Sequence, residues 1–144
     1  MGSKVETWLD TNIIIYFLRE NKEFSPAARQ LVADAMEGKI TLKVLPLVIA
    51  ECVFVLMGPQ FGRKKQEIAL ALTSFINLKG IEAEEKSVIE EALSNYSKKG
   101  IDFTDAFIAA HARAVTPAHV VTVNLKDFLH LGVRAERPEE VKRT

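Results

Sequence analysis

The alternation of short strand-like runs with longer helical patterns constrains this chain more than any other feature of its sequence. Segments with β-branched or alternating apolar residues occur at 5–10, 39–46, around Ile81 and at 119–124, and a last edge strand is expected near Val133. Helical patterns separate them. This order predicts an α/β layer structure with a mainly parallel sheet, whose ligand crevice lies outside the carboxyl ends of the strands.

The helical segments have recognisable start and stop residues. In SPAARQLVADAMEG, Ser25 is the expected N-cap, Pro26 the first helical residue and Gly38 the stop. Pro46 is expected to open the helix LVIAECVFVLM, and Gly58 to end it. Further helices are expected within 11–20, 64–80, 84–100 and 102–115, with a short one in 125–133.

Size and composition indicate one compact domain over residues 1–144. The chain is 48% hydrophobic and 26% charged, and its formal net charge is zero, so any polyanion must be held locally. The one cysteine, Cys52, lies in an apolar run, which indicates a buried, inert thiol and fits a reducing cytosol. No membrane-spanning stretch or signal peptide is recognised, so we expect a cytoplasmic protein without a membrane partner.

Two acidic residues stand alone in segments that otherwise look buried. Glu51 is the only charged residue in 44–62, and Asp10 is the only one in 7–18, where a strand gives way to a helix. An ionised carboxylate in an apolar setting is costly unless it is paired or bound to a metal. Both positions are therefore candidates for a functional site.

Each of these acids also has a purely structural interpretation. Asp10 is a good N-cap for the helix that follows, although Thr11 and Asn12 could cap it as well. Glu51 could form a buried salt bridge or lie on a wet edge of its helix. These alternatives remain open from the sequence.

A third acid, Asp105, opens the apolar helix FTDAFIAAHA and is the last charge before Arg113. Its structural alternative is stronger, because Asp102 and Asp105 have the spacing of a capping box. Taken together, however, three carboxylates on separate elements could converge at one end of the sheet, where a divalent cation would relieve their repulsion. Oxygen ligands without a His or Cys cluster favour Mg²⁺ or Mn²⁺, which activate water for attack on phosphorus.

Four stretches of the chain resemble the PIN domains, in particular the stand-alone PIN toxins of bacterial and archaeal toxin–antitoxin pairs. LDTNIIIYFL resembles the family's first acidic motif, IAECVFVL the second and DFTDAFIAAHA the third, which places the acids at Asp10, Glu51 and Asp105. VVTVNLKDF resembles the fourth motif. The resemblance covers nearly the whole chain and includes the tail RPEEV.

The resemblance implies a three-layer α/β/α sandwich and a metal-dependent endoribonuclease. The three acids would be catalytic and hold Mg²⁺ or Mn²⁺, and a cytoplasmic homodimer with an antitoxin partner is expected. Thr122 matches a hydroxyl residue that supports the site, and Thr11 and Asn12 are expected to support it too. Asn124 stands where many members have a fourth acid, so it is a possible metal ligand that leaves the number of metal ions open. Asp127 could compensate, although a surface role is the simpler interpretation.

The remaining candidates are weaker. Arg63, Lys64 and Lys65 could contact RNA phosphates, as could Lys98 and Lys99, but such runs are commonly solvated. Three aromatic residues and one histidine are interpreted as structural, and these are Trp8, Phe54, Phe107 and His111.

Two other functions compete with the ribonuclease. A phosphatase with Asp10 as covalent nucleophile is disfavoured, because such enzymes have a second Asp where this chain has Asn12. A degenerate fold that only binds RNA or protein is favoured by Asn124 and by the neutral net charge.

Overall fold

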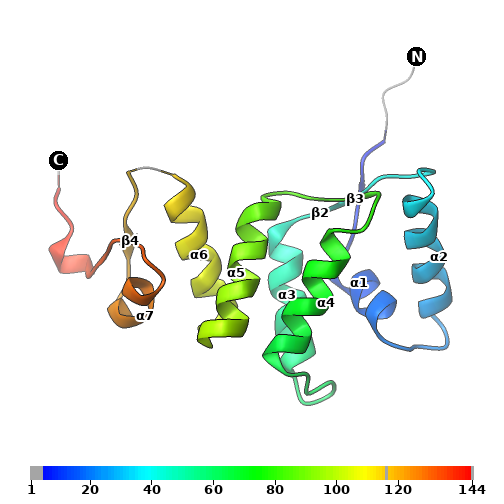
Figure 1. The fold of residues 1–144 in the computed structure, drawn as a ribbon, viewed down its shortest axis with the longest axis horizontal. Coiled ribbons are helices and arrows are strands. Elements are labelled where there is room, and N and C mark those ends of the chain that lie inside the picture. The colour runs from blue at the N-terminus through cyan, green and yellow to red at the C-terminus, as the bar shows by residue number, and fades with distance from the viewer. Residues whose placement is uncertain (1–4, 116, 144) are drawn as a thin grey trace. The chain divides into compact units, whose positions relative to one another are not determined.

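The computed structural model describes residues 5–115 and 117–143, which form two compact units, 5–86 and 87–143. The helices are long relative to the strands (Figure 1). All strand pairing among the described residues is parallel. The expected α/β class with a parallel sheet flanked by helices is thus confirmed. That the chain forms a single domain stays a prediction.

The first unit contains a three-stranded parallel sheet in the order β1-β2-β3. Leu42 of β2 pairs with Thr7 of β1 on one side and with Ile81 of β3 on the other. Helix α1 packs against α2 and α3, and α3 against α4. The elements are β1 (Thr7–Trp8), α1 (Thr11–Leu18), α2 (Ser25–Met36), β2 (Leu42–Val44), α3 (Pro46–Met57), α4 (Lys65–Ile76) and β3 (Ile81–Ala83).

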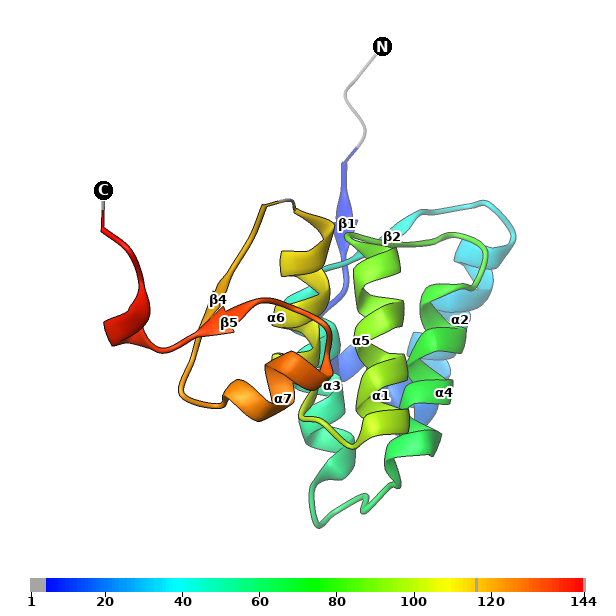
Figure 2. The same cartoon turned by 60° about the vertical axis from the view of Figure 1, so that its left-hand side comes forward.

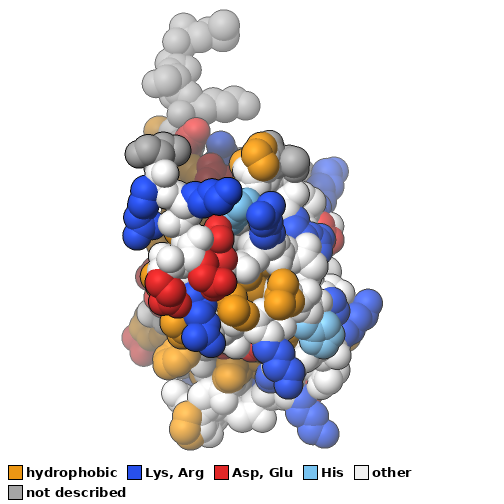
Figure 3. Space-filling model, turned by 90° about the vertical axis from the view of Figure 1, so that its left-hand side faces the viewer, with side chains coloured by type: hydrophobic (Ala, Val, Ile, Leu, Met, Phe, Trp, Pro, Cys, Tyr) orange, Lys and Arg blue, Asp and Glu red, His pale blue; other side chains and the backbone are white. Residues whose placement is uncertain are grey.

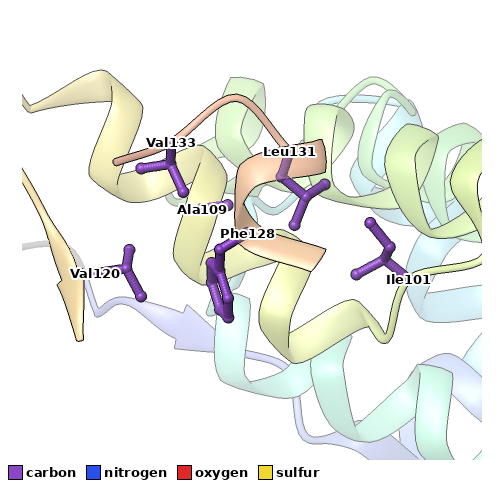
Figure 4. Close-up of a cluster of buried hydrophobic side chains, with 6 residues drawn as sticks. All are labelled: Ile101, Ala109, Val120, Phe128, Leu131 and Val133. Carbon is purple, nitrogen blue, oxygen red and sulfur yellow. The ribbon is translucent and has the colours of Figure 1, made fainter. Parts of the chain in front are cut away.

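The second unit contains a two-stranded parallel sheet, with β4 and β5 side by side in Figure 2. Helix α7 packs against α6 and β5. Phe128 lies at the centre of the buried cluster, between Val120 and Ile101 (Figure 4). The elements are α5 (Lys86–Lys99), α6 (Phe103–Ala114), β4 (Val120–Val121), α7 (Leu125–His130), β5 (Ala135–Glu136) and the short 3-10 helix Pro138–Glu140.

Most expected helix boundaries are confirmed, but the Ser25 cap is wrong. Pro46 is the first residue of α3 and Gly58 is its C-cap. Phe24 occupies the N-cap position of α2, and the buried Ser25 hydroxyl instead donates to the carbonyls of Tyr16 and Arg19, both at 2.7 Å. The Ser25 hydroxyl therefore links the start of α2 to the end of α1 through hydrogen bonds.

The aromatic residues expected in the core are only partly there. Trp8 is exposed, with its indole NH donating to Glu6 and Lys43 lying over its ring. Phe107 is half-buried and stacks with the ring of the exposed His111, and structural roles for both stay a prediction. In the part of the chain that the structure describes, no helix has the length and apolarity needed to cross a membrane.

Candidate functional site

Asp10 lies just beyond the carboxyl end of β1 and is the N-cap of α1. Its Oδ1 accepts a hydrogen bond of 2.8 Å from the Thr11 backbone NH, so the capping role considered from the sequence is confirmed. The carboxylate is exposed, whereas Thr11 is buried. The helix N-terminus stabilises the negative charge of Asp10. One carboxylate oxygen is thereby fixed in place, and the other remains available for a ligand.

Glu51 lies on the exposed face of α3, so the expectation that it sits in a buried setting is wrong. The buried residues of this helix, among them Ile49 and Cys52, face the core of the first unit. Leu47 and Phe54, one turn to either side of Glu51, are 70% and 77% exposed. The helix is apolar on both faces, which is why its sequence looks buried throughout. Phe54 is accordingly no core residue.

Cys52 shows that Asp10 and Glu51 share one neighbourhood. Burial raises the pKa of the Cys52 thiol to about 12, and the charges of Glu51 and Asp10 contribute to the rise. Both carboxylates therefore lie near this sulfur, where α1 packs against α3. The thiol is buried and uncharged at neutral pH, which confirms the inert free cysteine expected from the sequence.

Asp105 is the acid with the most perturbed surroundings in the second unit. It is half-buried in the first turn of α6. Burial raises its pKa, and the negative charges of Asp102 and Asp127 raise it further, while a hydrogen bond from the Asn124 side chain opposes them. Asp102 occupies the N-cap position without making a side-chain cap bond, so the capping-box interpretation is wrong. Asp105 is thus crowded by like charge.

The segment between β4 and α7 supports this acidic region. The Thr122 hydroxyl oxygen accepts from the Asn124 backbone NH at 2.9 Å, and the Asn124 side-chain amide donates to Asp127 Oδ2 at 2.8 Å. Asp127 is half-buried, so it is more than the surface residue that the sequence favoured. Its spacing of three residues from Asn124, at the start of a helix, is the signal that sequence reasoning undervalued.

The sequence-predicted acids thus form two local groups, one in each unit. Asp10 and Glu51 belong to the first unit, and Asp105 with Asn124 to the second; that they converge on one metal ion stays a prediction. Taken singly, neither unit holds three clustered His, Cys, Asp or Glu residues suited to a metal ion among its described residues. The available donors are carboxylate and amide oxygens, which fit Mg²⁺ or Mn²⁺.

That the basic run before α4 contacts RNA phosphates stays a prediction, and one of its three residues, Arg63, already has a partner. Arg63 pairs with Glu67 at 3.2 Å, Lys64 occupies the N-cap position of α4 and Lys65 begins that helix. Asn12, which the sequence predicts to support the site, is exposed and follows Thr11 at the start of α1. On the face shown in Figure 3, basic side chains are spread among acidic and hydrophobic ones and form no single basic field.

Comparison with known proteins identifies the family. A search of curated protein sequences gives no match to the chain. The model of the PIN domain family matches residues 8–130, a range that contains Asp10, Glu51, Asp105 and Asn124. PIN domains are in general nucleases, so a hydrolase of the nuclease type is indicated. The chain belongs to the PIN domain family.

Proposed function

We propose that this protein is a Mg²⁺- or Mn²⁺-dependent endoribonuclease that hydrolyses RNA phosphodiester bonds with Asp10, Glu51 and Asp105. The observation that carries the proposal is the crowding of Asp105, whose pKa is raised by burial and by two neighbouring acids. A bound divalent cation would relieve that repulsion. The family match supports the same set of residues, because all three acids lie within it.

Each acid has a distinct local setting for this role. Asp10 is oriented by its bond to the Thr11 NH, which leaves its second oxygen for a ligand. Glu51 is exposed on α3 and can reach a ligand in solvent. Asn124 holds Asp127 and lowers the pKa of Asp105 through a hydrogen bond. The metal ion would supply a water of lowered pKa and neutralise charge on the phosphate.

The biological setting is part of the same proposal. The resemblance to stand-alone PIN toxins supports a cytoplasmic toxin that forms a homodimer and is inhibited by an antitoxin protein. Single-stranded or structured RNA would be held by local contacts, because the chain has no net positive charge. Arg63, Lys64 and Lys65 are weak candidates for these contacts, since Arg63 already has a carboxylate partner.

A binding module without turnover is the second candidate function. It is favoured by Asn124, an amide where many members of the family have an acid, because the amide removes one negative charge from the site. Metal titration separates the two functions. A binding module would show no tight divalent site and no RNA cleavage.

The proposal is tested by RNA cleavage with purified variants. We expect Mn²⁺-dependent cleavage of a fluorogenic RNA by the wild-type chain, and a loss of about a hundredfold or more in Asp10→Asn, Glu51→Gln and Asp105→Asn. Asp34→Asn is the matched control, because Asp34 lies on α2 and bonds Gln30 on its own helix. Undiminished cleavage in chelator, or by Asp10→Asn, would contradict the proposal.

A further inference from the structure

A small pocket in the first unit lies apart from the proposed metal-binding acids, although one of its residues, Arg63, is also a weak candidate RNA contact. It has a volume of about 220 Å³ and lies where the ends of α1 and α3 meet the start of α4. The loop 58–64 that joins α3 to α4 is held by backbone bonds from Gly62 to Gly58 and from Arg63 to Leu56. The apolar wall of the pocket consists of Leu18, Leu56, Ile68 and Ala71.

Three charged residues complete the pocket wall, and one of them lacks a partner of opposite charge. Arg63 and Glu67 neutralise each other in an ion pair of 3.2 Å. Arg19 makes no ion pair with any residue that the structure describes, and its buried Nη1 has no hydrogen-bond partner there. Its guanidinium lies over the Phe61 ring at 4.6 Å, which compensates only part of the lost hydration.

The pocket is separate from the candidate metal ligands of its unit. Arg19 follows the last residue of α1, whereas Asp10 precedes the first. With eight helical residues between them, the two ends of α1 are about 12 Å apart along the helix axis. The pocket therefore lies one helix length away from Asp10, outside the group of candidate metal ligands.

The volume of the pocket and the charge of its wall indicate which kind of ligand it can bind. The volume of about 220 Å³ is below the roughly 300–1,000 Å³ of sites for drug-sized ligands, which disfavours a nucleotide. The apolar wall favours an apolar group, and Arg19, which has no partner of opposite charge among the described residues, favours an anion. A guanidinium binds a carboxylate through two parallel hydrogen bonds, and the single positive charge of Arg19 is balanced by a singly charged anion.

We propose that this pocket binds a carboxylate carried on a small branched apolar group, with Arg19 as its counter-ion. A rotation of the Arg19 side chain would present its donors to the carboxylate while the apolar group contacts Leu18 and Ile68. The same chemistry occurs in a free short-chain carboxylic acid and at the end of a peptide. The pocket is a binding site in addition to the proposed nuclease site, and ligand binding to it does not depend on nuclease activity.

Titration of the full chain with small probes tests the proposal, with backbone amide resonances as the readout. We expect isovalerate and N-acetylleucine to shift resonances of residues around the pocket in a saturable way, and isovaleramide to bind about tenfold or more weakly, because it lacks the charge. Tighter binding of N-acetylleucine would identify a peptide end, and tighter binding of isovalerate a free acid.

Two variants and one control make the test specific. Arg19→Met should weaken isovalerate binding by about tenfold or more, and Ala71→Leu should abolish it by filling the pocket. Arg29→Met is the matched control, because Arg29 already pairs with Glu20 at 2.8 Å. The spectra themselves report whether each variant is folded. The proposal is overturned if no probe gives saturable shifts, if isovaleramide or inorganic phosphate binds as tightly as isovalerate, or if Arg19→Met has no effect while folded.

Discussion

Replacing Asn124 by Asp tests the electrostatics of the second unit. The Asn124 amide donates to Asp127 Oδ2 at 2.8 Å, so the variant places a second carboxylate where a donor stood. Two unit charges that relax to about 4 Å repel by about 1 kcal/mol in bulk water and about 4 kcal/mol at an effective dielectric constant of 20. Asn124 is exposed and Asp127 half-buried, which places the repulsion at about 1–2 kcal/mol.

The lost hydrogen bond to a charged acceptor adds about 1.5 kcal/mol, so we expect Asn124→Asp to destabilise the metal-free protein by about 3 kcal/mol. Asn124→Ala loses the hydrogen bond to Asp127 without adding a negative charge, and should cost about half as much. Urea unfolding in chelator, followed by circular dichroism and by amide exchange of α7, measures both. The double variant Asn124→Asp with Asp127→Asn restores one donor and one acceptor and should recover most of the loss. The reasoning is refuted if the Asp variant is no less stable than the Ala variant.

Three further outcomes follow from the structure. Cys52, with its pKa raised to about 12, should react with a thiol reagent at neutral pH only as fast as the protein unfolds, which is measured by labelling across a urea series. Gly80→Ala should lower the free energy of unfolding by about 2 kcal/mol or more. Gly80 has a φ of +87°, and a Cβ there would lie 2.2 Å from the Ala35 carbonyl oxygen. Gly38→Ala is the milder control, because Gly38 also has a positive φ but a Cβ there would meet open space. Because the pKa of Asp105 is raised in the folded protein, ionisation of its carboxyl group lowers the stability of the fold. In chelator, the wild-type chain should therefore lose stability as the pH rises above the ordinary carboxyl range. Thermal melts at neutral pH should show Asp105→Asn to be more stable than wild type.

Local signals in the sequence were sufficient for much of the fold. The proline at position 46 and the glycine at position 58 bound α3 as expected, because their backbone restrictions act without help from distant residues. Asp10 was recognised both as a cap and as a candidate ligand, and the structure confirms the cap. The strands are shorter than their patterns suggested, since pairing with a neighbour decides where a strand ends.

Burial and long-range contacts were beyond the reach of local patterns. Glu51 looked isolated in an apolar helix, yet it is exposed together with Phe54, because apolar residues cover both faces of α3. Ser25 had the sequence of an N-cap but bonds the carbonyls at the end of α1, a contact that depends on how α1 meets α2. The environment of Asp105 likewise depends on Asp127, which lies on another helix.

The central proposal is that Asp10, Glu51 and Asp105 hold a divalent ion, and anomalous diffraction from a crystal soaked in Mn²⁺ tests it most directly. The account predicts an anomalous peak about 2.0–2.2 Å from carboxylate oxygens of Asp10, Glu51 and Asp105. A peak that lacks one of these three acids as a ligand, or no peak at saturating Mn²⁺, would contradict it.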